Sequence, residues 1–190
     1  LLARMHLAAH DYRGRCINSR GADWRCATAE KLLKAADAEN VALIRDELNS
    51  QEQFRLDTLP QGVIHADLFK DNVLFIDERL SGVIDFYYAC NDALLYDLAV
   101  TLNDWCFDVH GDYDAARGNA LLHAYAQLRA LTDGEKSAWP LTLRAAALRF
   151  FLSRLHDWTF PRAGDVVHVK DPAEYRRVLE HHRHRSLTLP

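Results

Sequence analysis

Four polar residues at fixed spacing could together do chemistry in this 190-residue chain. His65, Asp67 and Asn72 form the pattern H-x-D-x-x-x-x-N, and Asp85 follows thirteen residues after Asn72. A carboxylate of ordinary pKa, about 4, cannot ionise an alcohol beforehand, but it can orient the hydroxyl and accept its proton late. Asn72 and Asp85 offer oxygen ligands of the kind that Mg²⁺ prefers. Such a set suits phosphoryl transfer to an alcohol, which needs positioning and charge neutralisation.

Short strands must position these residues. Apolar runs between Gly62 and Phe86 alternate with polar, turn-forming residues, and this is the one convincing β region of the sequence. A hairpin turning over residues 77–80 would pair Val73 with Ile84 and, one step further, Asn72 with Asp85. Residues directly opposite project from one face, with Cβ atoms about 5 Å apart. The alternative, a plain polar turn between two strands, leaves the agreement of the offsets and the register unexplained.

The rest of the chain has mostly helical apolar spacing, so the predicted fold class is α+β and mostly helical. The helical segments are 1–10, 27–36, 41–48 and beyond, 94–107 and 113–131. No repeat, low-complexity tract or linker divides the sequence. We therefore expect residues 1–190 to form a single domain.

Two later helices carry explicit start signals. Thr132 and Glu135 have the spacing of a capping box, and the helix that they start should run toward Trp158, bent or restarted at Pro140. The string Asp171-Pro172-Ala173-Glu174 has the same spacing, with proline at the first helical position.

Composition and charge exclude several classes of protein. The chain is 49% apolar and 26% charged, as in ordinary globular proteins. Its 23 Lys and Arg against 27 Asp and Glu give a net charge of −4, so no overall positive field attracts nucleic acid or an anionic membrane. Four cysteines without a CxxC pair favour reduced thiols and a cytoplasmic protein. No apolar run approaches the about 20 residues that span a bilayer.

Three strings together resemble the aminoglycoside phosphotransferase and choline kinase superfamily, most closely its homoserine kinase branch. They are V-I-H-A-D-L-F at 63–69, V-I-D-F-Y-Y-A-C-N-D at 83–92, and L-R-F-F-L-S-R-L-H-D at 148–157. A D-x-A segment at 97–99 also matches, and the likeness runs from about residue 1 to about residue 180. It implies the C-terminal lobe of a protein-kinase-like fold with a small catalytic β-hairpin, and ATP and Mg²⁺ as cofactors.

The resemblance implies roles for the loop residues. Asp67 matches the catalytic aspartate, His65 the histidine that shapes its loop, and Asn72 and Asp85 the metal ligands. Asp97 matches an aspartate that steadies this loop from the next helix; its alternative role is to cap that helix.

The catalytic loop departs from the antibiotic kinases at two positions. Ala66 replaces a glycine, and Lys70 stands in a stretch that usually reads H-P-G. Lys70 could lie near the phosphates; the alternative is a surface lysine beside Asp71.

Candidate acceptor-binding residues follow Asp85. Asp104 and Trp105 resemble the acidic residue and tryptophan that line the ammonium pocket of choline kinases, and an indole beside a carboxylate can receive a cation. Trp105 could instead be a core aromatic. Tyr87 or Tyr88 could line the same pocket.

Two arginines on one predicted helix could bind a carboxylate of the acceptor. A guanidinium can hold a carboxylate with two parallel hydrogen bonds, so Arg149 or Arg154 is a candidate for this role. Because these two lie five residues apart on the helix, at most one is expected to contact the acceptor. His156 and Asp157, which are adjacent, are interpreted as surface residues.

The resemblance implies ATP-dependent phosphorylation of the side-chain hydroxyl of homoserine, a step of threonine biosynthesis. The alternatives are an aminoglycoside, choline or other amino-alcohol acceptor, or a non-catalytic kinase-like binding module. The chain begins at Leu1 within a predicted helix, and none of its eight glycines forms a phosphate-covering loop. We therefore expect that the N-terminal lobe is absent from this chain and that these 190 residues alone have little activity.

Overall fold

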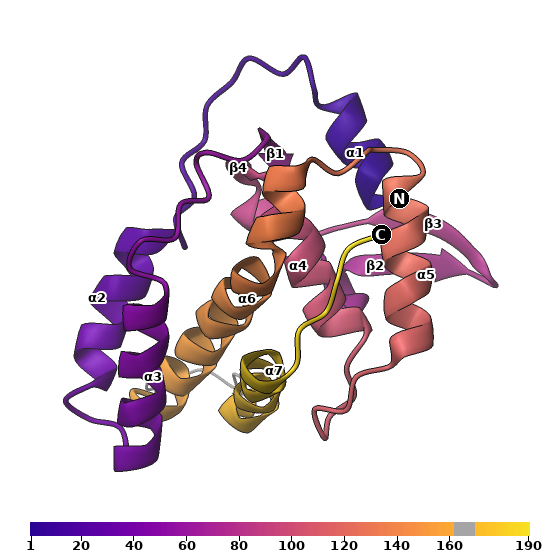
Figure 1. The fold of residues 1–190 in the computed structure, drawn as a ribbon. Coiled ribbons are helices and arrows are strands. Elements are labelled where there is room, and N and C mark those ends of the chain that lie inside the picture. Colours follow the sequence, from indigo (N-terminus) through magenta and orange to yellow (C-terminus); the bar gives the residue numbers. More distant parts are fainter. Residues whose placement is uncertain (162–169) are drawn as a thin grey trace.

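The computed structural model describes residues 1–161 and 170–190, which form a mostly helical α+β fold (Figure 1). This confirms the predicted fold class. The helices are α1 Leu2–Ala8, α2 Ala22–Leu32, α3 Ala38–Ser50, α4 Leu94–Trp105, α5 Ala115–Ala126, α6 Asp133–Thr159 and α7 Pro172–His184. The strands are β1 Gln61–Ile64, β2 Val73–Ile76, β3 Arg79–Val83 and β4 Cys90–Ala93, and single 3₁₀ turns cover Lys70–Asn72 and Phe86–Tyr88.

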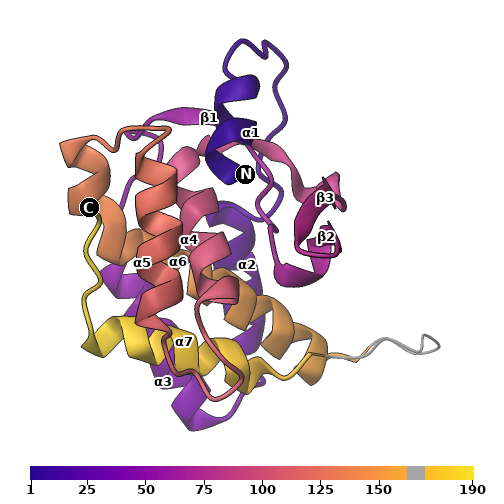
Figure 2. The same ribbon diagram turned by 90° about the vertical axis from the view of Figure 1, so that its right-hand side faces the viewer.

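Helix α6 runs through the middle of the molecule and carries much of the core. The α2–α3 pair lies on one side of it, α4 and α5 lie on the other, and α7 packs along it (Figures 1 and 2). Its side chains Trp139, Leu148 and Phe151 are almost fully buried, as are Leu98 and Leu102 of α4. Burying apolar side chains of this size contributes about 1.5–3 kcal/mol each. Packing against α6 therefore fixes the position of α4 and of the side chains that α4 presents to other segments.

Helix α6 begins as predicted but does not restart. The Thr132 side chain accepts a hydrogen bond from the Glu135 amide, and the Glu135 side chain accepts one from the Thr132 amide. The helix then continues through Pro140 to Thr159. A proline inside a helix removes one backbone hydrogen bond. Burial of Trp139 and Leu143 on either side of it holds this stretch in place.

Helix α7 also begins where the sequence predicts. Asp171 caps it by accepting a hydrogen bond from the Ala173 amide, and Pro172 occupies the first helical position. The reciprocal half of a capping box does not form here, because the Glu174 side chain pairs with Arg154.

The hairpin forms, but the predicted register is wrong. Its turn contains two residues, Asp77 and Glu78, so that Ile76 pairs with Arg79, and the register shifts once before Val73 pairs with Val83. Asp77 has a φ of 53°, a left-handed conformation that aspartate tolerates better than most residues and that permits this tight turn. Asn72 is consequently joined to the opposite strand by its carbonyl, which accepts a hydrogen bond from the Ile84 amide, and does not face Asp85 directly.

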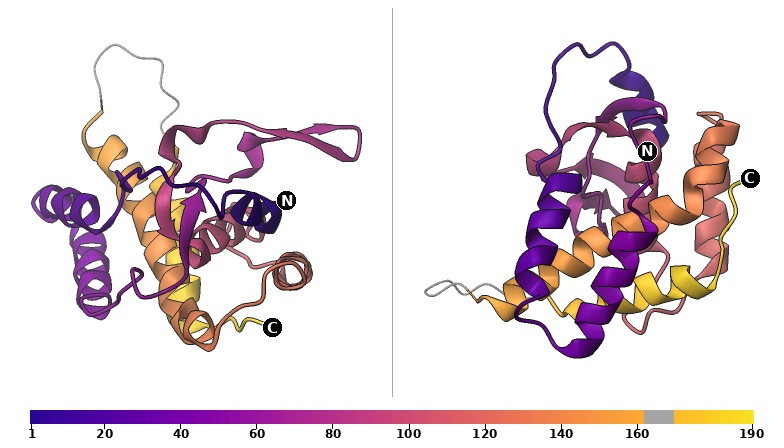
Figure 3. Two further views of the ribbon diagram at one scale, coloured as in Figure 1. Left: turned by 90° about the horizontal axis from the view of Figure 1, so that it is seen from above. Right: turned by 60° about the vertical axis from the view of Figure 1, so that its left-hand side comes forward.

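A second small sheet was not predicted. Strand β4 pairs antiparallel with β1, with Gly62 opposite Asp92 and Ile64 opposite Cys90. The sequence of β4 contains Asn91 and Asp92, which are unfavourable in strands, so pairing with β1 and not local preference makes it extended. The hairpin itself projects from the helical body (Figure 3). No helix in the described residues is long and apolar enough to cross a membrane.

A buried carboxylate joins three helices. Glu47 of α3 is completely buried and accepts hydrogen bonds from Arg144 of α6, at 2.7 and 3.1 Å, and from Arg183 of α7, at 3.1 Å. Because Glu47→Ala would leave these cations without their buried partner, we expect it to lower the free energy of unfolding by about 3–5 kcal/mol. Urea denaturation followed by circular dichroism would measure this.

The neighbouring Asp46 provides the control for Glu47. Its exposed carboxylate also pairs with Arg183, at 3.0 Å, so Asp46→Ala should cost less than about 1 kcal/mol. If both variants lost the same free energy of unfolding, the burial of Glu47 would not contribute to stability.

Candidate active site

Asp67 lies in the loop that follows β1 and faces a small cleft. The cleft has a volume of about 260 Å³ and is bounded by this loop, the 3₁₀ turn before β2, the residues after β3, Lys170, and α6. Its lining residues are Asp67, Phe69, Asp71, Asn72, Asp85, Tyr88, Arg149, Phe150, Ser153, Arg154, Asp157 and Lys170. The structure therefore brings Asp67, Asn72 and Asp85 together in one cavity, although the hairpin register is not the predicted one.

Asp97 holds the backbone of the Asp67 loop. Its two carboxylate oxygens accept hydrogen bonds from the His65 amide, at 2.8 Å, and the Ala66 amide, at 2.7 Å. Ala66 has a φ of 62°, which costs a residue other than glycine about 1–2 kcal/mol. The imidazole of His6 in α1 also lies 3.1 Å from the Asp97 carboxylate. Helix α4 is capped by Ala93, so the alternative prediction of Asp97 as its N-cap is wrong.

Asp104 and Trp105 lie outside the cleft and also hold this loop. The Asp104 carboxylate accepts a hydrogen bond from the Lys70 amide at 2.8 Å, and the indole N–H of Trp105 donates to the Leu68 carbonyl at 3.0 Å. Burial raises the pKa of Asp104, an effect that the Lys70 hydrogen bond opposes. Neither residue lines the cleft, and with Asp97 they fix the loop to α4 at successive points; their role in binding the acceptor stays a prediction.

His65 joins the loop to the residues before Asp85. Its Nε2 lies 3.0 Å from the Ile84 carbonyl, and its ring packs on Phe86 with the ring centres 4.7 Å apart. Because a carbonyl oxygen only accepts hydrogen bonds, this contact assigns the proton to Nε2. His65 does not line the cleft. Through these contacts it links the Asp67 loop to the segment that carries Asp85.

Asn72 and Asp85 have the chemistry of a small magnesium site. The Asn72 amide nitrogen donates to the Asp67 carbonyl at 2.8 Å, which leaves the amide oxygen as its ligating atom. Within the described ranges, no group of three or more His, Cys, Asp or Glu side chains could form a cage for a metal ion. Mg²⁺ usually takes one or two carboxylates from the protein and the rest of its ligands from water and phosphates, and Asn72 and Asp85 supply one amide oxygen and one carboxylate. The residues present fit such an ion.

Burial and neighbouring charges set the electrostatics of Asp67. Burial raises the pKa of its carboxyl, the positive charge of Arg149 opposes this rise, and the negative charge of Asp85 reinforces it. The Arg149 Nη1 atom lies 3.8 Å from the Asp67 carboxylate. Since a cation bound at Asp85 would remove the repulsion between the two carboxylates, Asp67 would then ionise more readily.

Two further predicted site residues also lie elsewhere. Tyr87 is 93% exposed, whereas its neighbour Tyr88 lines the cleft. The Lys70 ammonium lies 3.4 Å from the Phe107 carbonyl and is not among the cleft residues. Of the two predicted tyrosines, Tyr88 lines the cleft and Tyr87 does not, and the Lys70 ammonium lies outside the cleft.

The cleft wall on α6 contains both candidate arginines and also Asp157, which the sequence analysis interpreted as a surface residue. Arg149, Ser153 and Asp157 follow one another at intervals of four, so they lie on one face of the helix. Arg149 and Arg154 both line the cleft, although five-residue spacing argued that they would not share a face closely. The spacing of four was the signal that could have identified Asp157.

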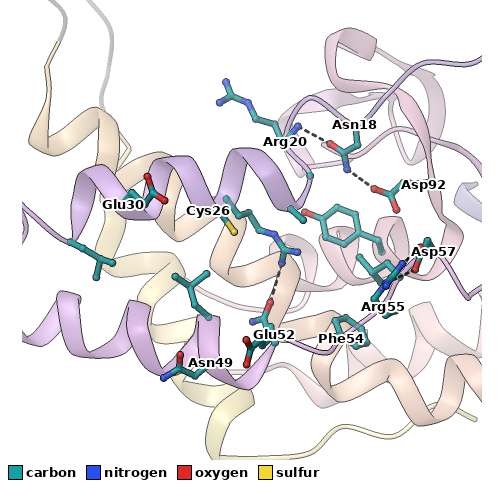
Figure 4. A pocket seen from close by; sticks show the side chains of 18 residues that line it. Asn18, Arg20, Cys26, Glu30, Asn49, Glu52, Phe54, Arg55, Asp57 and Asp92 are labelled. Carbon is teal, nitrogen blue, oxygen red and sulfur yellow. Dashed lines mark hydrogen bonds and ion pairs between the residues drawn. The ribbon is translucent and has the colours of Figure 1, made fainter.

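A larger cavity, of about 730 Å³, lies between α2, α3 and the segment before β1 (Figure 4). Its polar side chains mostly satisfy one another: Arg25 donates to Gln51, Asn18 donates to Asp92, and Arg55 pairs with Asp57. Asp67, Asn72 and Asp85 do not line it. The smaller cleft is therefore the candidate site.

Comparison with known proteins identifies the family. Residues 1–131, more than half of the chain, match the phosphotransferase enzyme family. The chain belongs to this family. Asp67, Asn72, Asp85 and Asp97 all lie within the matched residues.

Similar curated proteins are longer than this chain. Homoserine kinase of Methylobacillus flagellatus is 50% identical over 181 residues, which is 95% of this chain and 57% of that protein. Homoserine kinase of Rhizobium johnstonii is 45% identical over 187 residues, 96% of this chain and 58% of that protein. The chain thus spans a little over half the length of these phosphotransferases.

Solved structures of low sequence identity show the same fold. An ethanolamine kinase of Plasmodium vivax matches with a TM-score of 0.62 at 16% identity, over 96% of this chain and 57% of that one. An amicoumacin kinase, solved in complex with AMP-PNP, Ca²⁺ and Ami, gives the same TM-score and identity over 100% of this chain and 58% of that one. The likeness supports the predicted partial kinase-like fold.

Proposed function

We propose that the protein containing this chain transfers the γ-phosphate of ATP to the side-chain hydroxyl of homoserine. The observation that carries the proposal is that Asp67, Asn72 and Asp85 line one cleft in a member of a phosphotransferase family. The curated relatives named homoserine kinase, at 45–50% identity over most of the chain, favour homoserine among possible acceptors.

In this proposal Asp67 orients the acceptor hydroxyl toward the γ-phosphorus. As the new bond from the hydroxyl oxygen to phosphorus forms, the bond from phosphorus to the oxygen of ADP breaks, and the hydroxyl proton passes to a carboxylate oxygen of Asp67. A weak base suffices because the proton leaves late. Asn72 and Asp85 would hold Mg²⁺, which neutralises phosphate charge when bound. Asp97, Asp104, Trp105 and His65 keep the loop in place throughout.

The identity of the acceptor is tested by measuring ADP release by the full-length protein with a panel of candidate acceptors. Homoserine should give a kcat/KM at least about tenfold above those for choline, an aminoglycoside and methylthioribose. A higher kcat/KM for choline or an aminoglycoside would show that this compound, and not homoserine, is the acceptor. No ADP release with any of them would favour a non-catalytic kinase-like binding module. We expect little turnover from residues 1–190 alone, because this sequence contains no glycine-rich phosphate loop.

Two variants separate the loop-holding role of Asp104 from an ammonium-binding role. Asp104→Ala leaves the Lys70 amide without its acceptor, and a hydrogen bond to a charged group contributes about 1.5–3 kcal/mol, so kcat should fall about 10- to 100-fold. Asp104→Asn keeps an acceptor oxygen but removes the charge, and should retain most of the activity. Steady-state kinetics measure both. A large rise in the homoserine KM of Asp104→Asn, with kcat unchanged, would instead support ammonium binding.

A further inference from the structure

Among the described residues, three cations line the candidate cleft, and two of them are hydrogen-bonded to protein carboxylates. Arg154 forms an ion pair with Glu174 and donates to the Asp171 carbonyl. Lys170 pairs with Asp71 at 3.1 Å. Arg149 differs, since its contact with Asp67 is 3.8 Å long and exceeds hydrogen-bond distance.

The surroundings of Arg149 make its lack of hydrogen bonds costly. Its side chain is only 5% exposed, and the guanidinium lies over the rings of Phe150, at 3.8 Å, and Tyr88, at 5.1 Å. Within the described residues the guanidinium makes no hydrogen bond, although it can donate five. Aromatic faces stabilise the charge but accept few hydrogen bonds. A nearly buried guanidinium beside Asp67 that faces the cleft is therefore prepared for an anionic ligand.

We propose that Arg149 binds the carboxylate of the acceptor and so selects amino acids over amino alcohols that lack this group. This inference rests on the proposed function and assigns the carboxylate to Arg149 and not to Arg154. The hydroxyl of the acceptor lies at Asp67 and its carboxylate at Arg149. Because these anchors are 3.8 Å apart, a short acceptor with only a few bonds between its hydroxyl and its carboxylate can reach both. Homoserine meets both requirements.

The γ-phosphate of ATP is the other anion that could reach this guanidinium. Among the described arginines of the cleft, Arg149 is the one whose planar donors remain available, and a guanidinium can bind a carboxylate or a phosphate in two parallel hydrogen bonds. Nucleotide phosphates would be held on the side of Asn72 and Asp85 by their magnesium ion. The two roles make opposite predictions for an acceptor without a carboxylate.

The test compares homoserine with 3-aminopropan-1-ol, which is homoserine without its carboxylate, in the full-length protein. The unmodified enzyme should prefer homoserine by about 30- to 1,000-fold in kcat/KM, the range expected for a buried charge pair. In Arg149→Met the ratio of kcat/KM between homoserine and 3-aminopropan-1-ol should fall by about this factor, whatever the total activity, because the loss of charge beside Asp67 acts on both acceptors alike. Arg154→Met is the matched variant: whatever its total activity, its ratio between the two acceptors should stay near that of the unmodified enzyme.

Several outcomes would overturn the inference. Equal losses for both acceptors in Arg149→Met would show that Arg149 acts on Asp67 or on the γ-phosphate. An unmodified enzyme that uses both acceptors equally would show that the acceptor carboxylate is not recognised. The proposed phosphotransferase activity would still stand in that case. No phosphorylation of homoserine by the unmodified enzyme would contradict the proposed function itself. If Arg149→Met does not fold, Arg149→Lys serves in its place: it should weaken homoserine binding in equilibrium dialysis by about tenfold or more, and unchanged binding would contradict the role.

Discussion

Replacing Asp67 by asparagine should lower kcat for homoserine phosphorylation by about 10²- to 10⁴-fold, the contribution typical of a positioned general base. Asparagine has nearly the same size, and the loop is held by backbone hydrogen bonds to Asp97, so the fold and the KM for ATP should change little. What is lost is the ability to accept the hydroxyl proton. Initial rates of ADP release, with thermal unfolding recorded alongside, would measure the effect.

Asp23→Asn is the control for this substitution. Asp23 is an exposed residue in the first turn of α2, so the same change of residue type there should leave kcat within about twofold. An Asp67→Asn protein with more than a tenth of the normal kcat would rule out Asp67 as the proton acceptor.

Asp85→Asn should lower kcat about 10²- to 10³-fold and raise the Mg²⁺ concentration that gives half the maximal rate, because the cation loses its charged protein ligand. Asn is chosen because Asp85 has a φ of 63°, a conformation that asparagine adopts more easily than alanine. The substitution therefore removes the charge without adding backbone strain. A magnesium titration at saturating ATP would measure the shift.

Asp77→Asn is matched to it in residue type and in backbone conformation. Asp77 also has a left-handed φ, of 53°, but lies exposed at the tip of the hairpin. Its magnesium dependence should equal that of the unmodified enzyme. If Asp85→Asn needed no more Mg²⁺ than Asp77→Asn, Asp85 would not be a metal ligand.

The features that could be predicted from sequence are those whose determinants are local. The capping box of Thr132 and Glu135 and the cap at Asp171 lie within four residues of the helix starts that they set. The hairpin register failed for the opposite reason: it depended on Asp77 entering a left-handed conformation and on a shift between Leu74 and Phe75. Apolar alternation does not reveal either.

The placement of the acceptor candidates depended on packing between elements distant in sequence. Asp104 and Trp105 lie 34 and 37 residues from the backbone groups that they bind, and residue type alone could not distinguish these contacts from an ammonium pocket. Likewise, Arg149 and Arg154 look equivalent in sequence. In the structure both line the cleft, but Glu174 of α7 pairs with Arg154, whereas Arg149 makes no hydrogen bond within the described residues.

The central claim is that the cleft containing Asp67 transfers phosphate from ATP to homoserine. A single-turnover experiment with γ-labelled ATP and homoserine, quenched at successive times, observes the transfer step itself, apart from product release. We predict rapid appearance of labelled phosphohomoserine with the full-length protein and formation at least about 10²-fold slower with Asp67→Asn. Equal rates in the two proteins, or no labelled phosphohomoserine with the unmodified protein, would contradict the account.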